Sequence, residues 1–81
     1  MTTAGEIGRA LNALATTLGD QRPDRVDQSR LQQIVDGSLG GQRKLTIHAR
    51  GVTHAEVIDA EGGETIAVVA IENGRWGVSR T

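Results

Sequence analysis

The first third of the chain carries apolar residues at the spacing of an α-helix. The apolar stripe consists of Ile7, Leu11, Leu14 and Leu18. Residues that recur at intervals of three or four lie on one side of a helix with 3.6 residues per turn. Thr3 and Glu6 have the spacing of a capping box, in which each side chain accepts a hydrogen bond from the other residue's backbone amide. Gly19 is a suitable residue to end the helix, so we predict a helix over about residues 4–18.

A second, shorter helix is predicted after a polar linker. Its inward stripe consists of Leu31, Ile34 and Val35. Asp27 is a suitable N-cap, and Val26 lies where a hydrophobic side chain can staple onto the first turn. With Gly37 ending it, this helix covers about residues 27–36. Pro23 offers an alternative start, because proline is favoured at the first position of a helix.

From Arg43 onward the hydrophobic period changes to that of a β-strand. The predicted strands cover about residues 43–48, 52–59, 64–72 and 75–80. Asn73-Gly74 is typical of a two-residue hairpin turn of type I′. The segments 49–51 and 61–63 both end in glycine, which suits three-residue loops. These turns join the strands into an antiparallel meander.

Loop lengths fix the strand register, and the register decides which side chains share a face. The predicted pairs are Ile47 with Thr53, Leu45 with Ala55, Val57 with Ala67, Ala55 with Val69, Ile71 with Trp76, and Val69 with Val78. They form one mostly apolar face, with Trp76 at its end as part of the core. Helices followed by strands indicate an α+β fold. We therefore predict two N-terminal α-helices packed on one face of a four-stranded antiparallel β-meander, in a single domain over residues 1–81.

The opposite face of the sheet is expected to bind a partner. Strand 64–72 is apolar at successive positions, whereas a solvent-facing sheet should alternate between apolar and polar residues. An apolar patch with a polar rim is typical of a protein–protein interaction site. The predicted partner-binding residues are Val52, His54, Glu56, Ile58, Ile66, Val68 and Arg75. A register error of one residue over 53–57 would exchange the two faces.

Composition narrows the classes of function. The chain has no cysteine, which excludes disulfides and thiolate metal sites. It has one tryptophan and no phenylalanine or tyrosine, so it lacks the aromatic platforms on which single-stranded nucleic acids stack. The formal net charge of −1 also makes nucleic acid an unexpected partner. Residues 1–50 carry a net charge of +2 and residues 51–81 a net charge of −3.

Targeting signals are not evident in the sequence. The N-terminal residues include Glu6 and Arg9 and lack the apolar core of a secretion signal. No apolar run reaches the roughly 20 residues that a membrane helix needs. We therefore expect a soluble, cytoplasmic protein that does not contact a membrane.

Candidate catalytic and metal-binding residues are few. His48, His54 and Glu56 share the predicted open face, and two histidines with a carboxylate can ligate a metal. The two histidines are expected to be diagonal neighbours, about 7–8 Å apart, which is long for a single ion. No serine or threonine has a base at a recognisable spacing, and no small-molecule substrate is indicated. We predict no metal, no cofactor and no enzymatic activity.

The C-terminal segment "TIAVVAIENGRWGVSR", residues 65–80, resembles the last hairpin of NTF2-like (SnoaL-type) cone-shaped domains. Those domains often end in a strand, a short turn of Asn or Asp with Gly, and an Arg-Trp pair. The resemblance implies helices packed on one side of a curved antiparallel sheet. The chain is much shorter than such domains and lacks their third helix, and no catalytic residue carries over. We do not assign the chain to this family.

The sequence favours a small non-enzymatic protein–protein interaction module, such as an adaptor, an inhibitor or immunity protein, or a phage-type accessory protein. It would dock through the open sheet face or a strand edge. A second copy is the expected partner, because two-fold homodimers are the commonest assembly. Two alternatives stay open. One is an NTF2-like ligand-binding or catalytic domain, and the other is a weak nucleic-acid-binding regulator that uses Arg22, Arg25 and Arg30.

Overall fold

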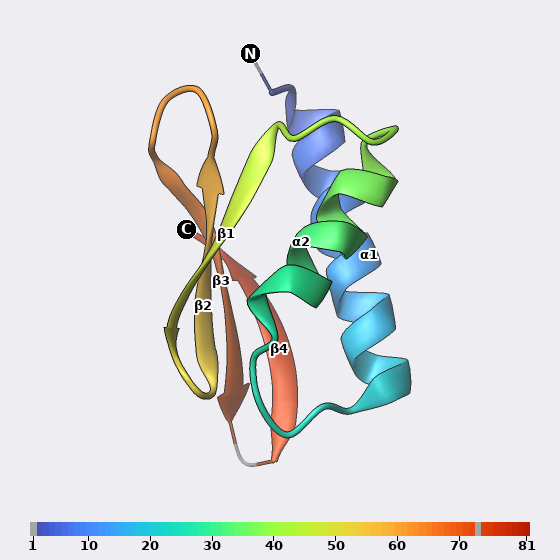
Figure 1. Cartoon of the computed structure of the whole chain (residues 1–81), viewed down its shortest axis with the longest axis vertical. Helices are drawn as coiled ribbons and strands as arrows, with labels where there is room; N and C mark the ends of the chain where they lie inside the picture. Colours follow the sequence, from blue (N-terminus) through green and yellow to red (C-terminus); the bar gives the residue numbers. More distant parts are fainter. Residues whose placement is uncertain (1, 73) are drawn as a thin grey trace.

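The computed structural model describes residues 2–72 and 74–81 and shows an α+β fold. The elements are α1 (Ala4–Gln21), α2 (Gln28–Ser38), β1 (Leu45–Gly51), β2 (His54–Asp59), β3 (Thr65–Glu72) and β4 (Arg75–Arg80). The strands form one antiparallel sheet in the order β1-β2-β3-β4. Both helices lie on one side of this sheet (Figure 1). The predicted fold class is confirmed.

Helix α1 begins where the sequence predicted but extends further. The capping box is present, since the Thr3 hydroxyl accepts from the Glu6 amide and the Glu6 carboxylate accepts from the Thr3 amide, each at 3.1 Å. The prediction that Gly19 ends the helix is wrong. Arg22 is the C-cap, in the left-handed conformation with φ of 45°, and its amide donates to the Leu18 carbonyl. Pro23 follows, and proline cannot continue a helix.

Helix α2 starts after Asp27, whose side chain accepts a hydrogen bond from the Arg30 amide. This agrees with the predicted N-cap, while Pro23, the alternative start, lies in the linker between the helices. The helix continues past Gly37 to Ser38, with Leu39 as its C-cap. Leu39 is buried, and its packing in the core stabilises the last turn of the helix beyond Gly37.

The second and third hairpins have the predicted strand registers. In the second, Ala55 pairs with Val69 and Val57 with Ala67. In the third, Val69 pairs with Val78, and Ile71 with Trp76. Gly63 and Gly74 have φ of 75° and 74°, a left-handed conformation that glycine adopts readily. Asn73, the other predicted turn residue, lies outside the described residues.

The predicted register of the first hairpin is wrong. Gly51 belongs to β1, and the turn lies at residues 52–53. Ile47 therefore pairs with Val57 rather than with Thr53, which is exposed in the turn. In the observed register every residue of β2 pairs with β1, and β1 has a bulge between Ala49 and Gly51. Because the difference from the prediction is an even number of residues, the inward residues that remain in β1 and β2 keep their face.

The core lies between the helices and the inner face of the sheet. Its largest fully buried side chains are Leu14, Val35, Leu45, Ile47, Val57 and Val69. They come from both helices and from β1, β2 and β3. Burying each such side chain stabilises the fold by roughly 1.5–3 kcal/mol. The predicted inward stripes of the helices and strands therefore meet in one cluster.

Two glutamines of α2 cover the edge of β1. The Gln32 amide group donates to the Leu45 carbonyl and accepts from the Ile47 amide, both at 2.8 Å. The Gln28 side chain accepts from the Ala49 amide at 2.9 Å. We call this pair of side chains the glutamine clamp. It satisfies the backbone groups that a neighbouring strand would otherwise bind.

Trp76 packs against the core and joins the sheet to the linker. Its indole N–H donates a hydrogen bond to the Pro23 carbonyl, and its half-buried ring contacts the buried cluster. The linker is also attached at Val26, whose amide donates to the Val52 carbonyl at 2.6 Å. A buried indole needs such a partner for its N–H. The predicted core position of Trp76 agrees with this arrangement.

Candidate interaction surface

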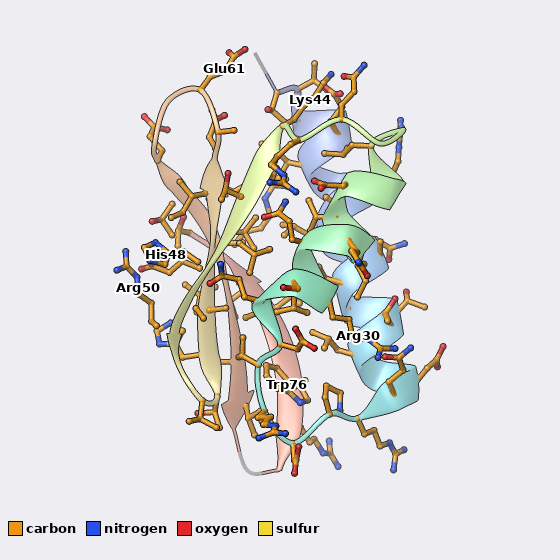
Figure 2. The ribbon with its side chains drawn as sticks, in the orientation of Figure 1. Arg30, Lys44, His48, Arg50, Glu61 and Trp76 are labelled. Carbon is orange, nitrogen blue, oxygen red and sulfur yellow. The ribbon has the colours of Figure 1, made fainter. Side chains whose placement is uncertain are left out.

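The helices leave one face of the sheet uncovered, which we call the outer face (Figure 2). Its side chains alternate along each strand with the buried residues of the inner face. His48 and Arg50 of β1 project from this side, whereas Trp76 lies on the side of the helices and linker. The outer face consists of Thr46, His48, His54, Glu56, Ile58, Val68, Ala70, Arg75, Gly77 and Ser79.

Most of the predicted partner-binding residues lie on the outer face. His54 and Arg75 are exposed, while Glu56, Ile58 and Val68 are half-buried. Glu56 pairs with Val68 across β2 and β3, so the charged and apolar members are neighbours. The structure therefore brings these residues together in one continuous surface.

Two predicted residues lie elsewhere. Val52 is in the β1–β2 turn, where 68% of its surface is exposed. The sequence predicts Val52 in a strand because the predicted loop ends at Gly51, one residue before the observed turn. Ile66 is half-buried and packs against the core, because the β2–β3 register shifts between Val57 and Ile58 and leaves Ile66 as the extra residue. A bulge of this kind changes the direction in which a side chain points.

Arg50 is part of this surface, although it was predicted to lie in a loop. It occupies the bulge of β1, and its guanidinium Nε donates to the Glu56 carboxylate at 2.7 Å. The Arg50 side chain is half exposed, so such a pair contributes little to stability, about 0–1 kcal/mol. Its effect is to orient both charges over β1 and β2. Only the correct register could have revealed the pair, since it depends on where β1 ends.

A shallow hollow interrupts the outer face over β3 and β4. It measures about 230 Å³ and is lined by Val68, Ala70, Arg75, Trp76, Gly77 and Ser79. Ala70 and Gly77 are paired directly across the two strands. The hollow exists because these small residues leave the apolar side of Val68 uncovered. It is open to a side chain from another molecule.

The histidines share the outer face but do not assemble a metal centre. His48 lies opposite Glu56, and His54 pairs with Ala70 of β3. Across residues 2–72 and 74–81, no three or more His, Cys, Asp or Glu side chains are grouped closely enough to hold a metal ion.

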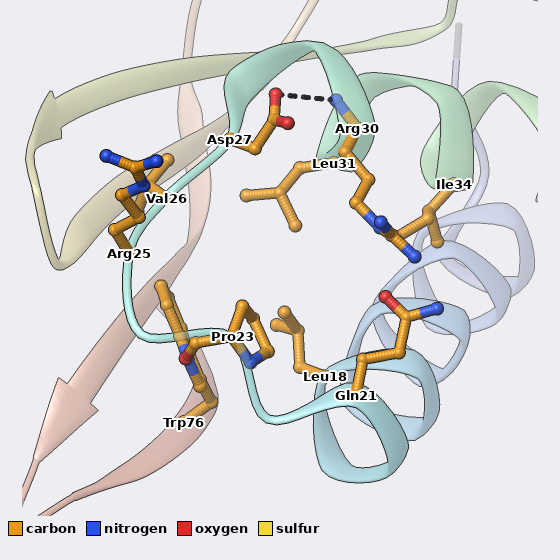
Figure 3. Close-up of a pocket in the computed structure, with 10 residues that line it drawn as sticks. All are labelled: Leu18, Gln21, Pro23, Arg25, Val26, Asp27, Arg30, Leu31, Ile34 and Trp76. Carbon is orange, nitrogen blue, oxygen red and sulfur yellow. Dashed lines mark hydrogen bonds between the residues drawn. The ribbon is translucent and has the colours of Figure 1, made fainter.

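A second pocket lies between the linker, the two helices and Trp76 (Figure 3). It is lined by Leu18, Gln21, Pro23, Arg25, Val26, Asp27, Arg30, Leu31, Ile34 and Trp76. Its volume is about 20 Å³, which is room for about one water molecule. Arg25 and Arg30 border it together with Asp27, so an acidic side chain accompanies two of the three arginines of the nucleic-acid alternative.

Neither helix in the described part of the chain has the length and apolar character needed to cross a membrane.

Comparisons with protein-family models, with curated proteins and with solved structures found no match to this chain.

Proposed function

We propose that the chain is a non-enzymatic protein–protein interaction module that docks through the outer face of its sheet. The observation that carries this proposal is the half-buried apolar group of Ile58, Val68 and Ala70, which no helix covers. Charged side chains border the group, with Arg50 and Glu56 on one side and Arg75 on the other. An apolar centre with a charged rim is the general design of a protein interface.

The partner that we propose for the outer face is a second copy of the chain. The face carries both signs of charge, so a two-fold arrangement can place Arg75 of one copy near Glu56 of the other. Isologous interfaces need this kind of self-complementarity. The hollow beside Val68 gives the facing apolar side chains room to interdigitate.

The test is the molar mass in solution, measured by light scattering over a dilution series. We expect the native chain to be a dimer and Val68→Glu to be a folded monomer, because a buried unpaired carboxylate is costly. Ser29→Glu, on the exposed side of α2, is the matched control and should remain dimeric. A native chain that is monomeric at every concentration would contradict self-association, and so would a dimer that Val68→Glu leaves intact.

The ligand-binding alternative is not favoured by the pocket near Trp76, because about 20 Å³ between the helices and the sheet cannot hold a small organic ligand. The nucleic-acid alternative gains no support from Arg25 and Arg30, since Asp27 shares their pocket.

A further inference from the structure

The two edges of the sheet are protected to different degrees. At β1 the glutamine clamp bonds to the outward Leu45 carbonyl and to the outward amides of Ile47 and Ala49. The other edge is β4. An edge strand with unpaired backbone groups can pair with another extended chain, so the state of β4 decides where such pairing can occur.

The backbone groups that β4 directs away from β3 can be assigned from its register. The Thr81 amide donates to the Ile66 carbonyl at 3.0 Å, so alternate residues before Thr81 also bond to β3. Trp76, Val78 and Arg80 therefore direct their N–H and C=O groups outward. No backbone or side-chain group of residues 2–72 and 74–81 forms a hydrogen bond to these outward groups.

Helix α1 packs against β4 but does not supply a clamp of the α2 kind on this side. Gly19 lines a pocket with Arg75 and Trp76, and Gly8 and Ala15 lie on the same line of the helix because their spacings are four and seven residues. None of these residues has a hydrogen-bonding side chain. The longer polar side chains near this line, Asn12 and Arg22, form no hydrogen bond to β4 in the described part of the chain, so its outward backbone groups stay unbonded.

The β4 edge is positively charged. Arg75 and Arg80 lie at its two ends, both exposed, and residues 75–81 include no acidic residue. Neither arginine forms an ion pair with any residue in the described part of the chain. Two such strands would repel each other, whereas carboxylates opposite the arginines would be attracted.

We propose that the open edge of β4 binds an extended acidic peptide by antiparallel strand addition. Carboxylates of the peptide lie opposite Arg80 and Arg75, and its backbone bonds to the outward groups of Trp76, Val78 and Arg80. An aromatic side chain opposite Gly77 covers the hollow of about 230 Å³ on the outer face. The backbone bonds of this site lie at the edge of the sheet, whereas self-association uses its outer face, and the two sites share Arg75 and the hollow.

The probe is a capped peptide with the core Glu-Thr-Val-Tyr-Val-Glu, and its control replaces both glutamates with lysine. We expect the acidic peptide to bind at least roughly tenfold more tightly than the lysine peptide, because each peptide end meets an arginine. Amide hydrogen exchange should slow at Trp76, Val78 and Arg80 on binding. Exchange at Ile47, which the glutamine clamp already protects, should not change.

Two variants separate strand addition from general electrostatic attraction. Val78→Pro removes one outward donor without removing a bond to β3, and proline is tolerated on an edge strand in this orientation. It should keep the native circular dichroism spectrum and lose roughly tenfold or more in peptide affinity. Arg75→Glu combined with Arg80→Glu should reverse the preference in favour of the lysine peptide, which a misfolded variant would not do.

The proposal is overturned if both peptides bind equally, if neither binds, or if the doubly charge-reversed variant keeps its preference for the acidic peptide. It is also overturned if a native dimer dissociates in Val78→Pro but persists in Val68→Glu, since the β4 edge would then hold a second copy. Loss of the dimer in Ile58→Glu, a substitution on the outer face but outside the hollow, with acidic-peptide binding retained, would support both proposed surfaces independently.

Discussion

Individual polar side chains decide how the helix layer is attached to the sheet. The Gln32 side chain bonds to backbone groups on both sides of one residue of β1, and the Trp76 indole bonds to the linker at Pro23. Gln32 is 9% exposed and also donates to the Asp36 carboxylate at 2.9 Å. Its bonds are therefore largely shielded from water, which makes them costly to remove.

Replacing Gln32 tests the importance of the glutamine clamp. We expect Gln32→Leu to lower the free energy of unfolding by about 1–3 kcal/mol, because the Ile47 amide and Leu45 carbonyl lose their partner in a buried place. The neighbouring Gln33 is exposed, so Gln33→Leu should change stability by no more than about 0.5 kcal/mol. Urea unfolding measures both. Equal effects of the two substitutions would contradict this role of the clamp.

The contact between Glu6 and Lys44 predicts an acid dependence of stability. The hydrogen bond from the Lys44 ammonium, together with that from the Thr3 amide, lowers the pKa of Glu6 from 4.5 to about 2. A carboxyl whose pKa is lower in the folded state stabilises that state above its unfolded pKa. The contribution is therefore complete above about pH 4.5 and is lost as the pH falls through about 2.

Unfolding curves collected between pH 2 and pH 7 test this dependence. Glu6→Gln keeps a capping-box acceptor for the Thr3 amide but cannot titrate. We expect its stability to fall less than that of the native chain between about pH 4.5 and pH 2. The exposed Glu64 provides the control, since Glu64→Gln should leave the native pH dependence in place. Identical pH profiles for the native chain and Glu6→Gln would rule out the contact in solution.

At the scale of elements, local signals located the beginnings of the helices better than their ends. Thr3 and Asp27 cap the helices as predicted, because an N-cap depends only on residues in the first turn. Helix α1 passes Gly19 and ends at Gln21, and its C-cap Arg22 is strained by a positive φ of 45°. The docking of Leu18 and of the linker onto the sheet favours the extra turn over the nearer glycine.

Moving the glycine to the observed helix end should stabilise the chain. A Cβ at Gly19 meets no atom within 4 Å, so Gly19→Ala should add roughly 0.5–1 kcal/mol. Arg22→Gly should add about 1 kcal/mol by relieving the left-handed conformation. Gly63→Ala is the opposite control, because φ of 75° disfavours alanine. Thermal unfolding measures all three, and a destabilising Arg22→Gly would mean that this arginine makes a contact worth more than the strain.

The hairpins show which sequence signals determine a register. The second and third hairpins have the predicted pairing because Gly63 and Gly74 occupy left-handed positions that glycine tolerates. In the first hairpin Gly51 does not form the turn. Strand β1 instead extends to Gly51 and so gains pairs with β2. A glycine in a strand sequence marks either a turn or a bulge, and the choice depends on how much pairing each register gains.

The whole molecule consists of a helix layer and a sheet that meet in a single buried cluster. Helix α2 packs on β1 and α1 packs on β4, so the first and last elements of the chain are in contact. Trp76 lies where β4, the linker and the end of α1 meet. Because it is the only aromatic residue, its fluorescence reports on the docking of the two layers.

This geometry predicts cooperative unfolding of the whole chain. We expect the unfolding transitions measured by Trp76 fluorescence and by far-ultraviolet circular dichroism to have the same denaturant midpoint, because neither layer can bury its apolar side alone. The protection of the strand amides against hydrogen exchange, measured by nuclear magnetic resonance at the same denaturant concentrations, provides an independent check. Fluorescence that changes at a lower midpoint would show that the layers separate before they unfold.

The sequence by itself determined the type of each element and most of the division of residues between core and surface. These follow from local periodicity, and an even register error does not exchange the faces of a strand. The tertiary structure decided where the helices end, how β1 pairs with β2, and that Ile66 turns toward the core. It also decided that glutamines protect one edge of the sheet while the other stays open. Such features depend on groups that are distant along the chain and meet only when the layers pack.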